Sequence, residues 1–472
     1  MNSLYIPTIG LEVHAELKTQ TKMFCACKNN PDEERPNWNI CPVCMGHPGT
    51  LPVINKEAVK HILKVGVAVG GKLADKSEFD RKNYFYPDIP KGYQISQYKY
   101  PLVSGGEING VKLTRIHLEE DTASSSHTKG NFSQVNFNRA GVPLLELVTE
   151  PVIHSASDAS KFGEELQLLL QYLGVSDANM EKGEMRLEAN ISVQRSDLEK
   201  GPKNLTLGTK VEVKNLNSFK SAERAILYEV ERHIKILEGG EEIKQETRGW
   251  DEVKQETFSQ RTKEDSHDYR YFPDPDLPKL VIAEISDFSF DKIKKELRET
   301  PSERRQRMVS VYGIKADDVE FFIKNKEYFN LFESTAKYLE KDLYQLLSNY
   351  IVSDIAGIGG VQIKPEYMKE LIIMLSKGEI SSRGAKIIIP LMLKEKIDPR
   401  TIAERENIFQ KNDEGEIESI VDLVIKQNEN AVLEYKNGKQ GALQYLVGQG
   451  MKISKGSANP QKISEIIKTK LG

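Results

Sequence analysis

Four short segments of the chain alternate apolar and polar residues with a period of two, as strands of a half-buried sheet do. They cover residues 11–17, 141–150, 186–193 and 210–214. In the first segment the apolar residues share one side of the predicted strand, and the other side holds Glu12, His14 and Glu16. The last two segments together predict an antiparallel sheet with carboxylates beside cations on one face.

Two glutamates occupy positions where this pattern calls for apolar residues. Glu146 lies inside an apolar run, and Glu120 shares the parity of Ile116 and Leu118. A desolvated carboxylate needs a cation or a full set of donors, because an unpaired buried charge costs several kcal/mol. For any one strand, a solvated face with surface salt bridges is the simpler interpretation. A dication held by His and carboxylate oxygens would account for all the segments together, and the interleaved Lys and Arg fit a hard metal bound with phosphate.

The chain changes in character twice along its length. Up to about residue 290, strand alternation is interrupted by helical patterns near residues 55–69, 157–173 and 218–237, which predicts an α+β domain. Charged amphipathic helices are predicted from there to the end of the chain. A second boundary is predicted around residues 395–401, where Pro399 breaks the helical pattern. With 472 residues, the chain has room for two to four domains.

All four cysteines lie within a span of twenty positions, as Cys25, Cys27, Cys41 and Cys44. Their paired spacing suits four thiolates around a tetrahedral zinc ion, although the first pair is closer than usual. Four cysteine ligands leave no open position, so the zinc would be structural. A pair of disulfides is the alternative, and it is disfavoured because nothing marks the chain as secreted.

Charge and targeting signals narrow the function classes. The net charge of −4 does not indicate a nucleic-acid binder, but residues 435–472 hold seven lysines against one acid, Glu465. These lysines suit either a solvated helix face or a surface that contacts a phosphate backbone. The start of the chain lacks a basic and apolar signal sequence, and no apolar run approaches the ~20 residues of a membrane span. These features predict a cytoplasmic enzyme or binding protein.

No glycine-rich phosphate loop, dinucleotide fingerprint or nucleophile elbow is found in the sequence. A nucleotide would therefore be held by the polar sheet face and its metal. Residues 79–98 mix aromatic and basic side chains, a composition that suits stacked bases and single-stranded ends as well as an ordinary core with its surface.

Seven motifs, in this order along the chain, resemble those of one family. They are residues 9–14, 79–97, 117–121, 138–146, 214–218, 268–273 and 435–460. Together they resemble the B subunits of the GatCAB aspartyl/glutamyl-tRNA amidotransferases, the GatB/GatE family, from about residue 6 to the end of the chain.

The resemblance implies an α+β fold with an antiparallel-sheet, cradle-shaped catalytic domain at residues 1–292, a helical connector at 293–400 and a YqeY-like, tRNA-binding helical tail at 401–472. It also implies a reaction. Such subunits use ATP and Mg²⁺ to phosphorylate the side-chain carboxylate of Glu-tRNA(Gln) or Asp-tRNA(Asn), and ammonia then displaces the phosphate. The ammonia comes from glutamine hydrolysed on an A subunit, and a small C subunit joins the two.

The site residues implied by the resemblance fall into three groups. His14, Glu120 and Glu146 would bind Mg²⁺, with Glu12, Glu119 and Glu150 close to them, and some of these carboxylates would line the ammonia route instead. Lys82, Lys210 and Lys214 would bind the phosphates of ATP. The acceptor end of the tRNA would contact Tyr84, Tyr86 and Tyr93.

The chain departs from the family pattern at three positions. Ser124 stands where the family usually has Lys, Glu188 where it commonly has Asp, and Asn136 where Asp is frequent. These departures concern the geometry of the phosphate site. Two other classes are considered: a non-catalytic, zinc-stabilised tRNA-binding adapter, and a metal-dependent phosphohydrolase that acts on a small substrate. The pairing of His14 with buried carboxylates argues against the adapter, and the basic helical tail argues against the hydrolase.

Overall fold

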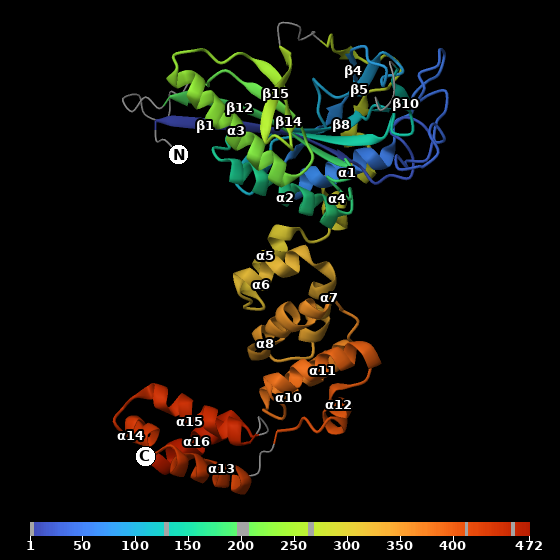
Figure 1. Ribbon diagram of the computed structural model, residues 1–472. Coiled ribbons are helices and arrows are strands. Elements are labelled where there is room, and N and C mark those ends of the chain that lie inside the picture. The colour runs from blue at the N-terminus through green and yellow to red at the C-terminus, as the bar shows by residue number, and fades with distance from the viewer. Residues whose placement is uncertain (1–3, 127–131, 196–206, 263–268, 411–413, 455–457) are drawn as a thin grey trace. The chain divides into compact units, whose positions relative to one another are not determined.

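The computed structural model describes residues 4–126, 132–195, 207–262, 269–410, 414–454 and 458–472. The chain forms two compact units, Met1–Pro301 and Ser302–Gly472. Every strand of the described residues lies in the first unit, and the second is helical (Figure 1). The predicted α+β class, with a helical second part, is confirmed.

The first unit is built on a ten-stranded sheet in the order β15-β14-β13-β12-β1-β11-β8-β6-β2, with β7 paired to β8. Neighbouring strands are antiparallel except β13 and β14, which are parallel. The predicted sheet is therefore confirmed, with one parallel pair that the sequence pattern did not indicate. The strands are β1 (Tyr5–Glu16), β2 (Lys72–Leu73), β6 (Val103–Ser104), β7 (Glu107–Ile108), β8 (Val111–Glu120), β11 (Pro143–Thr149), β12 (Met185–Arg195), β13 (Val211–Leu216), β14 (Glu246–Asp251) and β15 (Glu256–Thr262).

Smaller sheets border the large one. A three-stranded sheet joins β4 (Asp80–Asn83) to β5 (Tyr93–Ser96) and β16 (Phe272–Pro273). Two pairs complete the unit: β9 (Ser124–Ser126) with β10 (Gln134–Asn136), and β3 (Lys76–Ser77) with β17 (Leu280–Val281). The aromatic and basic segment 79–98 thus lies beside residues 272–273, which are far away in sequence.

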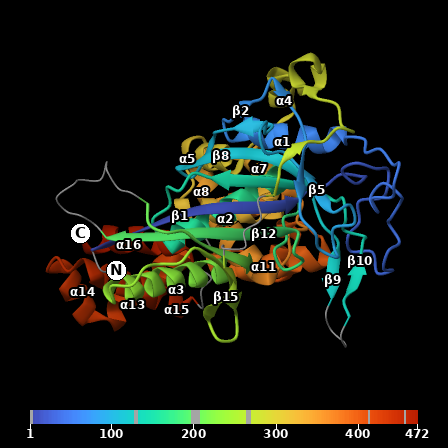
Figure 2. The ribbon, with the colours of Figure 1, turned by 90° about the horizontal axis from the view of Figure 1, so that it is seen from above.

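Helices cover the apolar face of the large sheet. They are α1 (Lys56–Ala68), α2 (Ala156–Leu173), α3 (Phe219–Glu238) and α4 (Phe290–Glu296). The side chains of Asn55, Ser155 and Ser218 accept hydrogen bonds from backbone N–H groups in the first turns of α1, α2 and α3, which explains where these three predicted helices begin. One hydrophobic core joins all four helices to the apolar sides of β1, β8, β11 and β12. In Figure 2, β8, β1 and β12 run alongside one another in this sheet.

The second unit is helical throughout its described residues. Its helices are α5 (Pro301–Ser310), α6 (Ala316–Lys324), α7 (Lys326–Ala336), α8 (Tyr344–Asn349), α9 (Ala356–Ile358), α10 (Pro365–Ser376), α11 (Ser382–Glu395), α12 (Pro399–Arg405), α13 (Glu414–Gln427), α14 (Glu429–Lys436), α15 (Gln440–Ile453) and α16 (Pro460–Leu471). A π-helix at Tyr350–Ile355 joins α8 to α9. Among the described residues, no helix has both the length and the apolar character needed to cross a bilayer.

The predicted boundaries at residues 292 and 400 both fall inside helices. Helix α4 belongs with the sheet unit, where Glu296 lies 2.7 Å from the Lys60 ammonium of α1. Helix α12 belongs with the preceding helices, because Arg400 pairs with Glu370 and Glu379 at 2.9 Å each. Helices α13, α15 and α16 enclose a hydrophobic cluster of their own around Val421 and Leu446. A separate tail domain stays a prediction, and this cluster supports a start near residue 414.

A buried ionic network joins α3 to the β14–β15 hairpin. Glu229 is fully buried and lies 2.8 Å from the guanidinium of Arg232 and 3.2 Å from that of Arg248. Burial alone would raise the pKa of Glu229, but the contact with His233 and hydrogen bonds from Arg232 and Thr257 lower it to about 2. The carboxylate is therefore charged, and together with Glu246 it neutralises the guanidinium groups of Arg232 and Arg248 at the edge of the sheet.

We expect Glu229→Gln to lower the free energy of unfolding of the sheet unit at neutral pH by about 3 kcal/mol, because it removes one of the two carboxylates, Glu229 and Glu246, that pair with Arg232 and Arg248. Urea unfolding followed by tryptophan fluorescence measures this, since both tryptophans, Trp38 and Trp250, lie in this unit. The exposed Glu231 of the same helix provides the matched control, Glu231→Gln.

The same ionic network makes the stability of the sheet unit depend on pH. The pKa of Glu229 falls from 4.5 to about 2 on folding, so its contribution is fully present above pH 4.5 and is lost as the pH falls towards 2. The stability of wild type and Glu229→Gln should therefore converge over this range. A constant difference between them would contradict the assignment.

Candidate active site

A row of polar side chains crosses four strands on the open face of the large sheet. The strand register places Arg186 of β12 opposite His14 of β1, His14 opposite Glu146 of β11, and Glu146 opposite His117 of β8. Because side chains alternate along each strand, directly opposed residues point to the same face. The predicted polar face is confirmed, and Glu146 belongs to it although its strand is apolar in sequence.

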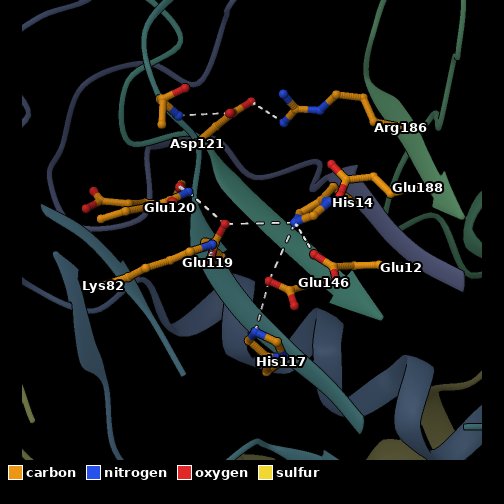
Figure 3. A network of polar contacts seen from close by, with 12 residues as sticks. Glu12, His14, Lys82, His117, Glu119, Glu120, Asp121, Glu146, Arg186 and Glu188 are labelled. Carbon is orange, nitrogen blue, oxygen red and sulfur yellow. Dashed lines mark hydrogen bonds and ion pairs between the residues drawn. The ribbon is translucent and has the colours of Figure 1, made fainter. Parts of the chain in front are cut away.

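Glu146 lies between the two histidines of this row (Figure 3). Its Oε2 atom is 3.5 Å from His14 Nε2 and 3.2 Å from His117 Nε2. His14 Nε2 also lies 3.8 Å from Glu12 Oε1 and 3.9 Å from Glu119 Oε1. Glu119 and Glu146 are 3 % and 5 % exposed, so these carboxylates are removed from bulk water.

The charges of this cluster shift one another's pKa values. Burial would lower the pKa of His14, but the hydrogen bond to Glu146 and the charges of Glu146, Glu188 and Glu12 raise it to about 9. Burial would raise the pKa of Glu146, but His117 and His14 hold it well below its ordinary value. For Glu12, burial and the charge of Glu146 raise the pKa. The cluster therefore concentrates negative charge, and this charge favours the protonated form of His14.

The donor atoms form two sets that could each hold a metal ion. Glu12, His14 and Glu146 make up one set, and His117, Glu119 and Glu146 the other, with the ligand atoms of each set within 4.8 Å of one another. Glu146 is common to both. Carboxylate oxygens suit Mg²⁺, which keeps part of its coordination for water and phosphate.

Lys82 provides the cation nearest to these carboxylates from outside the large sheet. Its ammonium lies 3.5 Å from Glu119 Oε2 and 5.2 Å from the centre of the Tyr269 ring. Tyr84 is connected to the same carboxylate through an amide. Its hydroxyl donates to Gln94 Oε1 at 2.7 Å, and Gln94 Nε2 donates to Glu119 Oε1 at 2.7 Å. Lys82 and Tyr84, both predicted from the sequence, thus adjoin the cluster.

Glu120 lies apart from the cluster, as its parity with Ile116 and Leu118 indicated. Its Oε1 atom accepts a hydrogen bond from the Ile95 backbone N–H at 2.8 Å and another from the Lys91 ammonium. The buried carboxylate of Glu120 is thus paired with a cation and a backbone donor, as a desolvated charge requires. The position beside His14 and Glu146 expected for Glu120 is occupied by Glu119.

Other predicted residues also lie apart from the row. Glu150 accepts a hydrogen bond from the Thr114 hydroxyl at 2.8 Å, just beyond the end of β11. Lys210 is exposed and directly precedes β13. Lys214 does lie on the polar face, where its ammonium is 2.6 Å from Glu188 Oε2. Glu188, which departs from the family pattern, therefore holds a cation beside Glu12.

Aromatic residues in the segments that flank the strands of the three-stranded sheet form a shelf next to Lys82. Tyr98 stacks on Tyr271 with ring centres 4.4 Å apart and planes 12° from parallel, and 58 % of Tyr98 is exposed. Tyr84 contacts both Tyr86 and Tyr269 edge to face. Tyr93 instead faces Arg81, whose guanidinium carbon lies 4.2 Å from the ring centre.

The remaining departures, Ser124 and Asn136, are opposed to each other in the β9–β10 pair. Asn136 Oδ1 accepts hydrogen bonds from the backbone N–H groups of Asn37 and Asn138, at 3.0 and 3.1 Å. Asn136 thus fastens the cysteine-bearing loop to β10.

The four cysteines converge as predicted. All are free thiols, and their sulfur atoms lie within 4.8 Å of one another, so the alternative of two disulfides is not supported. The sulfur atoms of Cys41 and Cys44 are 3.9 Å apart. A tetrahedron of thiolates about 2.3 Å from a zinc ion has edges of about 3.8 Å. The residues present therefore fit a tetrathiolate metal centre.

Sequence reasoning missed His117, Tyr269 and Tyr271 as site residues. The parity that His117 shares with Glu119 would have placed it on the polar face. No sequence pattern identified the two tyrosines. They directly precede β16, near the C-terminal end of the sheet unit's sequence, and only the pairing of β16 with β4 brings them to the site.

Two family models match the chain. The GatB/GatE catalytic domain matches residues 7–286, and the GatB domain matches residues 330–471. Among curated proteins, the chain is 42% identical to a protein of Carboxydothermus hydrogenoformans described as the B subunit of an aspartyl/glutamyl-tRNA(Asn/Gln) amidotransferase, with 99% of each chain covered. It is 43% identical to the protein of the same description from Thermotoga maritima, with 98% of each chain covered.

The different contacts of Glu119 and Glu120 predict different roles for these adjacent carboxylates. We expect Glu119→Gln to weaken Mn²⁺ binding by about tenfold or more, because it removes a negative charge and one carboxylate oxygen from the cluster. Glu120→Gln should leave Mn²⁺ binding nearly unchanged and lower stability by about 3 kcal/mol, because Lys91 loses its partner. Calorimetric titration with Mn²⁺ and urea unfolding of both variants measure these effects. Loss of Mn²⁺ binding in Glu120→Gln alone would reverse the assignment.

Proposed function

The chain belongs to the GatB/GatE family, and from this we propose that it is the B subunit of an aspartyl/glutamyl-tRNA(Asn/Gln) amidotransferase. In this reaction the side-chain carboxylate of Glu-tRNA(Gln) or Asp-tRNA(Asn) attacks the γ-phosphorus of ATP, and ADP leaves. Ammonia then attacks the acyl phosphate, inorganic phosphate leaves, and Gln-tRNA(Gln) or Asn-tRNA(Asn) is formed. The reaction takes place with the other components of translation in the cytoplasm.

The observation that carries this proposal is the buried set of carboxylates around His14 and Glu146. Phosphorylation is needed because an unactivated carboxylate would have to expel oxide. When bound, Mg²⁺ neutralises charge on the phosphate oxygens. Glu12, His14, Glu119 and Glu146 would hold the ion, with His117 fixing the orientation of Glu146 from the other side.

Cations near this set would orient the nucleotide. Lys82 lies next to Glu119, where its ammonium could bind a phosphate oxygen of ATP. Lys214 is held on the same face by Glu188 and Glu212, at 2.6 and 3.4 Å. Both are stronger candidates for phosphate contacts than the exposed Lys210.

The aromatic shelf would receive the acceptor end of the tRNA. Single-stranded RNA ends bind through bases stacked on aromatic side chains and phosphates paired with cations. The stacked pair Tyr98–Tyr271 presents an open ring, and Tyr84, Tyr86 and Lys82 lie on the same small sheet and its loops. An aminoacyl group at the end of this shelf would reach the carboxylate cluster.

The four-cysteine centre, made of Cys25, Cys27, Cys41 and Cys44, would hold a structural zinc ion. Four thiolates fill a tetrahedral site and leave no position for a substrate, so zinc would stabilise the loops of residues 25–44 without entering the reaction.

The complete enzyme requires partners. An A subunit would hydrolyse glutamine and supply ammonia, and a C subunit would join the two. A zinc-stabilised adapter that only binds tRNA is a weaker proposal, because binding does not require carboxylates and histidines buried against one another.

Glu146→Gln in the assembled complex should lower ATP-dependent amide formation by about 10²-fold or more, because the shared donor of both ligand sets is lost. The assay supplies free ammonia, ATP and Glu-tRNA or Asp-tRNA, so that it bypasses glutamine hydrolysis. Glutaminase activity in the same preparation should persist, which shows that the complex has assembled. Glu150→Gln is the matched control and should retain activity. Near wild-type amide formation by Glu146→Gln would overturn the proposed site.

The tail lysines should contribute to tRNA affinity. Lys436, Lys452 and Lys468 are exposed, whereas Lys439 pairs with Glu434 and Lys470 with Glu418 and Asp422; Lys455 lies outside the described residues. If the first three contact phosphates, replacing them with Gln should reduce the slope of log affinity against log salt by about 0.9 per lysine.

Filter binding of tRNA between low and physiological salt measures this slope. The paired lysines provide the control, Lys439→Gln with Lys470→Gln, whose slope should change less. Equal slopes for the triple variant and wild type would place the tRNA contact elsewhere.

A further inference from the structure

Lys22 is fully buried, three residues before the first cysteine of the four-cysteine centre. Its ammonium donates a hydrogen bond to the Phe137 carbonyl oxygen at 3.2 Å. The ion pairs found among the described residues do not include Lys22. A buried ammonium without a counter-charge costs several kcal/mol, so another anionic group must balance it.

The nearby anionic group is the thiolate cluster. A Cβ built on Gly141 would lie 3.7 Å from Cys44 Cβ and 3.8 Å from Lys22 Cδ, so both side chains pack under the same glycine. The backbone N–H of Lys22 donates to the Cys27 carbonyl oxygen at 2.9 Å.

The net charge of a zinc-loaded four-cysteine centre explains why Lys22 is buried beside it. Four thiolates around Zn²⁺ carry a net charge of −2, in a centre where Cys44 itself is buried. One adjacent ammonium halves that charge. The burial of Lys22 is thus favourable when the centre is loaded and unfavourable when the thiols are neutral and metal is absent.

We infer that Lys22 is a positioning residue that balances the charge of the metal-loaded four-cysteine centre and fastens this centre to residues 137–142. This inference rests on the proposed structural zinc. It assigns Lys22 a role toward the metal that packing alone would not require.

Residues 137–142 connect directly to the strands that carry the carboxylate cluster. The Met23 N–H donates to the Gly141 carbonyl oxygen at 2.7 Å, and the Gly141 N–H donates to the Asp121 carbonyl oxygen at 2.9 Å. Asp121 directly follows Glu119 and Glu120, and its carboxylate lies 3.0 Å from Arg186 on the polar face (Figure 3). Residues 137–142 also immediately precede β11, which carries Glu146. The metal centre therefore supports the backbone on both sides of the carboxylate cluster.

Three variants of the purified full chain separate charge from hydrogen bonding. Lys22→Gln keeps a donor for the Phe137 carbonyl but removes the charge, Lys22→Arg keeps the charge, and Lys28→Gln alters an exposed lysine next to Cys27. Zinc affinity is measured by competition with a chromophoric chelator. We expect Lys22→Gln to bind zinc about 10–100-fold more weakly than wild type, the usual effect of losing a partner outside the ligand shell. Lys22→Arg and Lys28→Gln should remain close to wild type.

Stability with and without zinc distinguishes this role from a purely structural one. Lys22→Gln should lower the unfolding temperature more in zinc-loaded protein than in chelator-treated protein, whereas lost packing would lower both equally. Wild-type zinc affinity in Lys22→Gln, or an equal loss of stability in both states, would overturn the inference. Absence of zinc binding in wild type would instead overturn the zinc proposal itself.

A measurement on wild type covers the case in which Lys22→Gln does not fold. Removal of zinc should increase hydrogen exchange at the amides of Met23 and Gly141, because Lys22 then loses its counter-charge. Unchanged exchange at these amides would show that the centre does not fasten residues 137–142, and the inference would fail.

Discussion

Glu146 is a buried carboxylate held between two imidazoles, and this arrangement constrains the strands on either side of it. Its charge is stabilised in the interior by His14 and His117, which lie directly opposite on β1 and β8, and by the Arg115 guanidinium 3.7 Å away. A shift of one residue in either strand pairing would turn one histidine towards the apolar core and remove one of the partners of the carboxylate. The register of the central strands and the chemistry of the site are therefore fixed by the same contacts.

The same face collects charge from segments far apart in the chain. Strand β1 supplies Glu12 and His14, β8 supplies His117 and Glu119, and β12 supplies Arg186 and Glu188. The helices on the opposite face make this possible, because a well-packed core holds the strands rigidly while their outward side chains serve binding. A site built on strands has little freedom to adjust, which suits chemistry that depends on placing a carboxylate next to a phosphate.

Charge balance also accounts for the buried residues outside the row. Glu120 is paired with Lys91, Glu229 with Arg232 and Arg248, and Lys22 lies against the cysteine cluster. Each of these groups contacts a segment that is distant from it in the sequence. Lys91 pairs with Glu120 and packs against Gly46, and Lys22 packs beside Cys44 under Gly141, so both lysines lie next to the segment that carries the cysteines.

The sequence alone determined which segments form strands and helices, because the alternation in residues 11–17 and 186–193 and the capping residues of the three long helices are local signals. It also determined that the cysteines form one centre and that Glu120 and Glu146 need partners. Tertiary structure decided which partners they have. Glu119, rather than Glu120, lies beside His14. The carboxylate of Glu120, at the end of β8, points the other way and is held by Lys91 and by the Ile95 backbone N–H of β5. Cross-strand register places His117 at the site, and the β4–β16 pairing places Tyr269 and Tyr271 there. Local sequence patterns do not predict such long-range contacts.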